Sequence, residues 1–270
     1  MVGPNLPELG GGTKAEVTVD GNRLETLRLP PQLPGLPTLV MLHEGLGSIA
    51  YWKDFPQRIA AQTGLGVFVY SRHGYGDSAP LQGKRSVGYM HHEAEVVLPL
   101  LLKEVGIERP LLLGHSDGGS IALIYAGCYP DSPSGLILEA PHVFVEDLSV
   151  ECIAKAKILY ETTDLPTRLG RYHRHVESTF WGWNDIWLDP DFRSWNIESY
   201  LDSIICPVLV VQGANDEYGT FRQADAIQKR IPWAQIRMLP NCGHSPHRDQ
   251  QDLTLNEIAQ FIEIFRLGRT

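Results

Sequence analysis

The chain has 270 residues, 43% hydrophobic and 20% charged, which is enough apolar content for a sizeable core and too much for wholesale disorder. Its net charge of −9 disfavours nucleic acid and anionic membrane surfaces as partners. The apolar runs are far shorter than the roughly 20 residues of a membrane helix, and no secretory signal opens the sequence. The four cysteines have no CxxC spacing, so we expect buried thiols in a cytoplasmic protein. We also expect a small-molecule substrate as the partner, and the sequence leaves a homodimer open.

The predicted elements alternate between strands and helices. The first dozen residues, rich in Gly and Pro, predict a loose lead-in, and Asp20-Gly21-Asn22 predicts a hairpin turn between strands at 16–19 and 24–29. Later apolar runs predict strands buried on both faces, at 38–42, 67–70, 111–113, 136–138 and 208–211. The stretches between them predict helices at 52–62, 88–105, 119–129, 221–230 and 253–266. This order is typical of a doubly wound α/β sheet with the hairpin at one edge.

One segment interrupts the alternation. More than sixty residues separate Glu139 from Pro207, where a crossover helix needs far fewer. We predict a helical lid at 141–205, inserted into a core formed by 1–140 and 206–270. The segment holds four of the six tryptophans, namely Trp181, Trp183, Trp187 and Trp195. Large aromatic side chains can form the lid's own core, so a role in substrate binding is the alternative to be tested.

The motif GHSDGG at residues 114–119 carries the sharpest chemical signal. It follows a predicted strand and precedes a predicted helix, which is the context of a nucleophilic serine on a strained turn. Glycines two residues before and after Ser116 fit the crowded positions of such a turn. The helix N-terminus beneath Ser116 favours a developing oxyanion. We therefore predict Ser116 as the nucleophile.

A nucleophilic serine needs a base and an acid that orients the base. Two loops that follow C-terminal strands offer them: one presents Asp216 and the other His244. Catalytic groups of open parallel sheets gather at the carboxyl ends of the strands, so these side chains should converge on Ser116. Glu139 is the rival acid because it follows the preceding strand, and Glu217 is the neighbouring alternative.

The glycine-rich loop HEGLGS at 43–48, after the strand at 38–42, predicts part of an oxyanion hole. One backbone amide would come from Asp117, directly after the nucleophile. The other would come from Gly45 or Leu46, and the sequence leaves both open. Substrate contacts are expected from His43, Glu44, His142, Trp181, Trp183 and Trp187. No phosphate loop, dinucleotide fingerprint or metal-ligand spacing appears, so neither a cofactor nor a metal is implied.

Together the His43 loop, SRHGYGDS at 71–78, the GHSDGG elbow and the Asp216/His244 pair resemble the α/β-hydrolase superfamily. The likeness spans residues 38–266 and implies a mostly parallel eight-stranded sheet with helices on both faces, a helical lid and a Ser–His–Asp hydrolase. The elbow is similar to that of biphenyl-hydrolase-like and valacyclovirase-like esterases and of some perhydrolases. The chain departs from the family at Glu44, where a glycine usually follows the histidine. Serine rather than aspartate at the elbow argues against dehalogenase and epoxide hydrolase chemistry.

The resemblance and the residues together predict a serine hydrolase that cleaves a small-molecule carboxylic ester, lactone, thioester or amide through an acyl-enzyme. Alternatives on the same triad are a carbon–carbon bond hydrolase acting on a vinylogous diketone and a perhydrolase. A ligand-sensing receptor on the same fold with little turnover is the alternative from another class. Asp117 and Glu44 predict a preference for cationic substrates, unless Asp117 faces a structural arginine instead.

Overall fold

The computed structural model describes residues 12–267. The loose lead-in predicted for the first dozen residues lies almost entirely outside this range. Within it, each helix is too short or too polar to cross a membrane. All four cysteines are free thiols: Cys206 and Cys242 are buried as predicted, whereas Cys128 is exposed and Cys152 is half-buried, because both lie on helix faces turned toward the surface.

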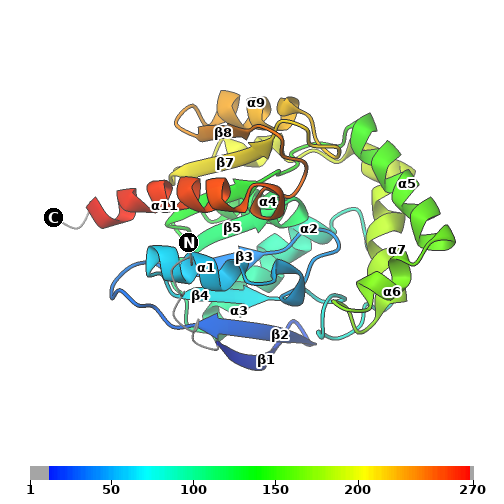
Figure 1. Cartoon of the computed structure of the whole chain (residues 1–270), viewed down its shortest axis with the longest axis horizontal. Coiled ribbons are helices and arrows are strands. Elements are labelled where there is room, and N and C mark those ends of the chain that lie inside the picture. Colours follow the sequence, from blue (N-terminus) through cyan, green and yellow to red (C-terminus); the bar gives the residue numbers. More distant parts are fainter. Residues whose placement is uncertain (1–11, 268–270) are drawn as a thin grey trace, which may run out of the picture.

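The centre of the described range is a twisted eight-stranded sheet (Figure 1). Its strands are β1 (Thr13–Val19), β2 (Asn22–Leu29), β3 (Leu39–Leu42), β4 (Val67–Tyr70), β5 (Leu111–His115), β6 (Gly135–Glu139), β7 (Val208–Gly213) and β8 (Gln235–Leu239). They lie in the order β1-β2-β4-β3-β5-β6-β7-β8. Only β1 with β2 and β2 with β4 pair antiparallel; the other pairs are parallel. The predicted hairpin therefore forms one edge of an otherwise parallel sheet.

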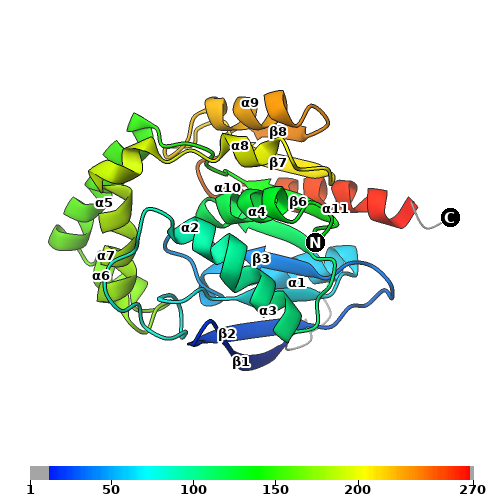
Figure 2. The same ribbon diagram turned by 180° about the vertical axis from the view of Figure 1, so that it is seen from behind.

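Helices cover both faces of this sheet. The core helices are α1 (Phe55–Thr63), α2 (Tyr89–His92), the π-helical η2 (Glu93–Val97), α3 (Leu98–Glu104), α4 (Asp117–Cys128), α9 (Phe221–Arg230), α10 (Pro246–Asp249) and α11 (Gln251–Leu267). Figure 1 shows α1 and α11 on one face, and Figure 2 shows α2, α3 and α4 on the other. Alternate strand residues feed the two cores: Leu39 and Met41 pack with α1 and α11, whereas Val40 and Leu42 pack with α3 and α4.

The chain between β6 and β7 forms a separate group of helices beyond one end of the sheet (Figure 1). These are α5 (Asp147–Thr162), α6 (Leu165–Leu169) and α7 (Val176–Trp187); after the short η3 (Pro190–Ser194), α8 (Glu198–Leu201) lies back on the core, against α4 and α9 (Figure 2). Aromatic rings join them: Tyr160 stacks on Phe180 at 3.8 Å between centroids, and Phe192 lies 5.4 Å from Trp195. Most aromatic residues of this segment therefore pack against one another.

The two adjacent histidines of α2 differ in their surroundings. His92 is exposed and bonds to Asp20, whereas His91 is half-buried, with its ring 5.5 Å from that of Tyr200. The inserted segment covers this part of the helix, and the sequence gives no sign of that contact.

Candidate active site

Ser116 occupies a sharp turn between β5 and α4. Its φ of 53° and ψ of −116° place a non-glycine residue in a strained conformation. A Cβ atom at Gly114 would collide with the Gly118 carbonyl, and one at Gly118 would collide with the Leu42 carbonyl. Only glycine fits either position, so the strand and helix can approach closely enough to present Ser116 at the carboxyl edge of the sheet.

His244 and Asp216 meet at the same edge. Nδ1 of His244 lies 2.9 Å from Oδ1 and 3.0 Å from Oδ2 of Asp216, whose side chain is 2% exposed. Burial alone would raise the pKa of Asp216, but the charge and hydrogen bond of His244 and the backbone N–H of Tyr218 lower it. The carboxylate is thus ionised and fixes the Nδ1–H tautomer, which leaves Nε2 of His244 as a base.

The two alternative acids have other partners. Oε2 of Glu139 lies 2.6 Å from Nδ1 of His247, and both side chains are buried. Oε2 of Glu217 accepts the backbone N–H of His244 at 3.1 Å rather than bonding to the imidazole. Both carboxylates therefore hold the loop that carries His244, and Asp216 alone of the three bonds to its ring.

The residues predicted for the oxyanion hole surround the same point. Gly45 and Leu46 line the pocket beside Ser116, and a Cβ atom at Gly45 would collide with the indole of Trp183. Asp117 is the first residue of α4, so its backbone N–H has no partner within the helix. Its side chain is 1% exposed and accepts a 2.6 Å hydrogen bond from the Tyr89 hydroxyl.

The carboxylate of Asp117 faces a buried arginine. Nη2 of Arg72 lies 3.8 Å from Oδ2 of Asp117, and both side chains are almost fully buried. This structural arginine is the alternative that the sequence left open for Asp117. The prediction that Asp117 attracts a cationic substrate is therefore wrong.

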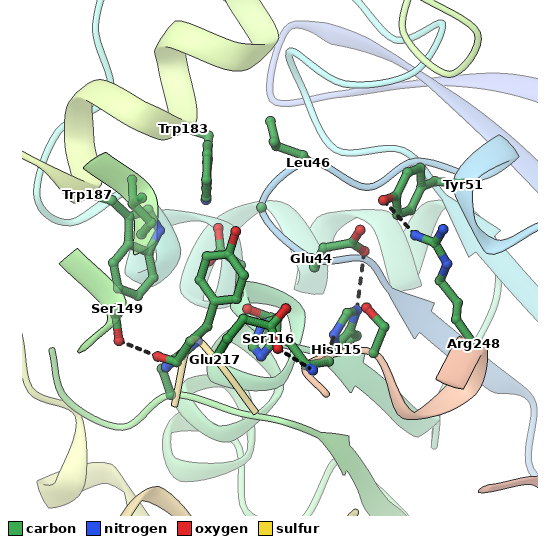
Figure 3. Close-up of a pocket in the computed structure, with 17 residues that line it drawn as sticks. Glu44, Leu46, Tyr51, His115, Ser116, Ser149, Trp183, Trp187, Glu217 and Arg248 are labelled. Carbon is green, nitrogen blue, oxygen red and sulfur yellow. Dashed lines mark hydrogen bonds and ion pairs between the residues drawn. The ribbon is translucent and has the colours of Figure 1, made fainter. Parts of the chain in front are cut away.

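A pocket of about 280 Å³ opens above Ser116 (Figure 3). Its apolar wall comes from Leu46 and from the inserted helices, which contribute Ile153, Trp183 and Trp187. Its polar wall contains Glu44, Tyr51, His142, Glu217, Tyr218 and Arg248. The cavity can thus hold a small molecule with an apolar group beneath the indole rings.

Three of the predicted substrate contacts differ in their surroundings. His142 lines the pocket, where burial and the nearby His244 lower its pKa to about 3 and keep it neutral. His43 is fully buried outside the pocket lining, and its Nε2 accepts the backbone N–H of Arg72 at 3.0 Å. Trp181 lies on the outer side of α7 and donates Nε1–H to Glu177 at 2.9 Å. His43 and Trp181 are therefore wrong as substrate contacts: one joins two loops and the other packs on the outer face of the segment.

Sequence reasoning missed several lining residues. Tyr218 lies two residues beyond Asp216 in the same loop, so proximity to the predicted acid is a usable signal. Tyr51 and Arg248 carry no motif, although both line the pocket and Nη1 of Arg248 donates to the Tyr51 hydroxyl at 2.6 Å. His115 belongs to the elbow motif but received no role. Among the described residues, no group of three or more His, Cys, Asp or Glu side chains is arranged to hold a metal ion.

Residues 39–257 match the alpha/beta hydrolase family. Because this match covers most of the chain, the protein belongs to the alpha/beta hydrolase family and is a hydrolase. The eight-stranded sheet and the family resemblance inferred from the motifs are both confirmed.

The individual relatives share little sequence identity with this chain. The chain is 26% identical to human serine hydrolase BPHL over 199 residues, which cover 72% of this chain and 68% of BPHL. It is 23% identical to a 2-hydroxy-6-oxononadienedioate/2-hydroxy-6-oxononatrienedioate hydrolase of Comamonas testosteroni, over 94% of this chain and 99% of that one. The crystal structure of proline iminopeptidase from Mycobacterium smegmatis superposes with a TM-score of 0.75 at 18% identity, over 96% of this chain and 100% of the other. The weak likeness to BPHL-type enzymes is confirmed.

Proposed function

We propose that the protein is a serine hydrolase that cleaves a small-molecule carboxylic ester through a covalent acyl-enzyme. One observation carries the proposal: the ionised Asp216 holds His244 in the tautomer of a general base, and His244 lines the same pocket as Ser116 on its strained turn. Lactones, thioesters and amides share this chemistry, because each presents a carbonyl carbon to the nucleophile.

Ser116 attacks the substrate carbonyl while Nε2 of His244 takes the hydroxyl proton. The bond between the carbonyl carbon and the leaving group then breaks, and the His244 imidazolium gives its proton to the departing oxygen. Water repeats the attack on the acyl-enzyme with His244 again as base, which releases the acid and restores Ser116. Asp216 stays ionised throughout and stabilises each imidazolium.

Two backbone amides would stabilise the tetrahedral oxyanion. One is the N–H of Asp117 at the start of α4, and the other belongs to Gly45 or Leu46. Such a donor contributes about 3–4 kcal/mol to transition-state stabilisation in comparable enzymes. Contact between Gly45 and Trp183 joins the oxyanion loop to the segment at 141–205, which we propose to act as the lid.

A labelling and turnover assay tests this function. The purified protein should react stoichiometrically with a fluorophosphonate probe at Ser116 and turn over short p-nitrophenyl esters many times per labelled site. Matched lactones, amides and meta-cleavage diketones in the same assay would define the bond that is cleaved. Labelling with at most one slow turnover on every substrate would favour a ligand-sensing receptor, and labelling at another residue would contradict the proposal.

The lid tryptophans should select apolar or aromatic acyl groups. Trp183 and Trp187 line the pocket, so truncating either to Ala should lower kcat/KM for a benzoyl ester by about tenfold to a hundredfold, as expected for the loss of one well-buried apolar contact. An acetyl ester reaches less of this wall and should lose much less. The measurement is the benzoyl-to-acetyl ratio of kcat/KM for each variant.

Trp181→Ala is the matched control, because Trp181 belongs to the same helix but lies outside the pocket. It should leave the benzoyl-to-acetyl ratio near that of the parent. If all three variants leave the ratio unchanged, the indole rings serve only the lid's packing, and the proposed preference for aromatic substrates is wrong.

A further inference from the structure

Glu44 lies in the predicted oxyanion loop, and its carboxylate is directed at the nucleophile elbow. The side chain is 14% exposed, and Oε2 lies 3.3 Å from Nδ1 of His115, the residue before Ser116 (Figure 3). A Cβ atom at Gly47 would collide with the same carboxylate oxygen. The oxyanion loop is therefore shaped around a carboxylate that points at β5.

His115 is fully buried and has an acceptor at each ring nitrogen. Its Nε2 lies 2.7 Å from the backbone carbonyl oxygen of His244, while Nδ1 faces Glu44. A carbonyl and a carboxylate can only accept, so both bonds form together only when both nitrogens carry hydrogen. With Glu44 ionised, the geometry thus requires an imidazolium between the oxyanion loop and the loop of the catalytic base.

We propose that Glu44 is a positioning residue that keeps His115 protonated, so that one buried imidazolium ties the oxyanion loop and the loop of His244 to the nucleophile elbow. This inference rests on the proposed serine hydrolase function. It assigns a role to a carboxylate of the pocket that the proposed reaction does not use.

Glu139 and the backbone carbonyl of His244 favour the same charge state of His115. Burial would lower the pKa of His115, but the hydrogen bond and charge of Glu44, with Glu139 behind it, raise it to about 8. Burial would raise the pKa of Glu44, but His115 holds it well below its usual range. The rings of His244 and His247 lie 5.2 and 5.0 Å from His115, and Trp52 covers its remaining side. Near neutral pH the pair is therefore a carboxylate and an imidazolium.

The arrangement predicts an alkaline limit to activity. Because the pKa of His115 is raised, the imidazolium is present below about pH 8 and is lost above it. Neutral His115 keeps one hydrogen and must give up its bond either to Glu44 or to the His244 carbonyl. We expect kcat to fall with an apparent pKa near 8 while KM changes little, because the pocket walls remain in place.

Two substitutions of Glu44 separate the effect of the positive charge on His115 from the effect of the hydrogen bond between the two side chains. In Glu44→Gln the amide can donate to Nδ1 of a neutral His115 whose Nε2–H still donates to the carbonyl, so the link survives without an imidazolium. We expect kcat at pH 7 to fall by less than about tenfold, the scale of one altered hydrogen bond, and the alkaline limb near pH 8 to disappear. Glu44→Gly removes the link, and kcat should fall by about tenfold to a hundredfold at every pH, with KM within a few-fold of the parent.

A spectroscopic measurement reports the same charge independently of turnover. In protein labelled at histidine ¹³Cε1, one buried resonance should titrate near pH 8 in the parent and be neutral throughout in Glu44→Gln. Glu217→Gln is the matched control, because it also removes a pocket carboxylate but one bonded to the His244 backbone N–H. Its alkaline limb and its histidine resonance near pH 8 should remain.

The outcomes distinguish this inference from the function on which it rests. If Glu44→Gln keeps the alkaline limb and the histidine titration of the parent while Ser116→Ala is inactive, the positioning role is wrong and the triad stands. If Ser116→Ala retains full turnover, the proposed function itself is wrong. Should Glu44→Gly fail to fold, Glu44→Gln decides alone through the pH profile and the resonance.

Discussion

Ser116→Ala is expected to lower kcat/KM for a p-nitrophenyl ester by about 10⁴-fold or more, because the acyl-enzyme cannot form without the hydroxyl. The fold should persist, since alanine removes one oxygen from a turn whose shape is set by Gly114 and Gly118. Steady-state kinetics measures the loss, and circular dichroism with a thermal melt checks the fold. The strained φ at residue 116 remains, so little change in melting temperature is expected.

Ser245→Ala provides the matched control. Ser245 lines the same pocket and lies directly after His244, so its hydroxyl is as close in sequence to the proposed chemistry as a non-catalytic one can be. Its removal should cost at most a few-fold. Full activity in a purified, folded Ser116→Ala protein would reject the serine mechanism. If Ser245→Ala lowered kcat/KM as much as Ser116→Ala, the loss would reflect a general disturbance of the pocket rather than removal of the nucleophile.

Most of the sheet was predictable from the sequence because the parallel strands β3 to β7 are buried on both faces and each contains a short, continuous apolar run, whereas the edge strand β8 is partly exposed. The strand at 67–70 and the helix at 221–230 were predicted to their final residues. Other boundaries shifted where polar residues continue a strand: β5 and β6 extend through His115 and Glu139, whose side chains are buried at the site. His115 and Glu139 are polar residues of the candidate site, so the apolar pattern that predicts the strands does not include them.

The candidate triad was also accessible to sequence reasoning, since carboxyl ends of parallel strands converge wherever the strand order allows. The sequence did not show which charged side chains pair with one another. Glu139 ends β6 and Asp216 lies in the loop after the neighbouring β7, and only the positions of His247 and His244 show which acid meets which imidazole. The link between Glu44 and His115 likewise joins residues 71 positions apart.

The orientation of the tryptophans in the segment between β6 and β7 was likewise not predictable from the sequence. Their spacing showed that they could not share one helix face, but it did not show which face turns toward the pocket. Packing of Tyr160 and Phe180 rotates α7 so that Trp181 lies outside and Trp183 lies against Gly45. Tertiary contacts, rather than helix periodicity, therefore select the residues that meet a substrate.

Asp216→Asn is expected to lower kcat by about 10⁴-fold with the pocket intact, because an amide can donate to Nδ1 and so favours the tautomer of His244 that has no free base at Nε2. The same substitution removes the negative charge that stabilises the imidazolium. Glu139→Gln and Glu217→Gln should keep activity within about tenfold of the parent, since both leave the His244 ring paired: Glu139 bonds to the backbone N–H and Nδ1 of His247, and Glu217 accepts the backbone N–H of His244.

Comparison of the three variants decides between the acids. Glu139→Gln disturbs a buried contact with His247, so its main expected effect is a lower melting temperature, whereas Asp216→Asn should affect turnover far more than stability. Fluorophosphonate labelling rates add a readout that is independent of substrate binding, because they follow the nucleophilicity of Ser116. If Glu139→Gln is the variant that abolishes labelling and turnover while Asp216→Asn is mild, then Glu139 rather than Asp216 orients the base. The loop of His244 must then rearrange during the reaction, because in the structure its ring faces Asp216.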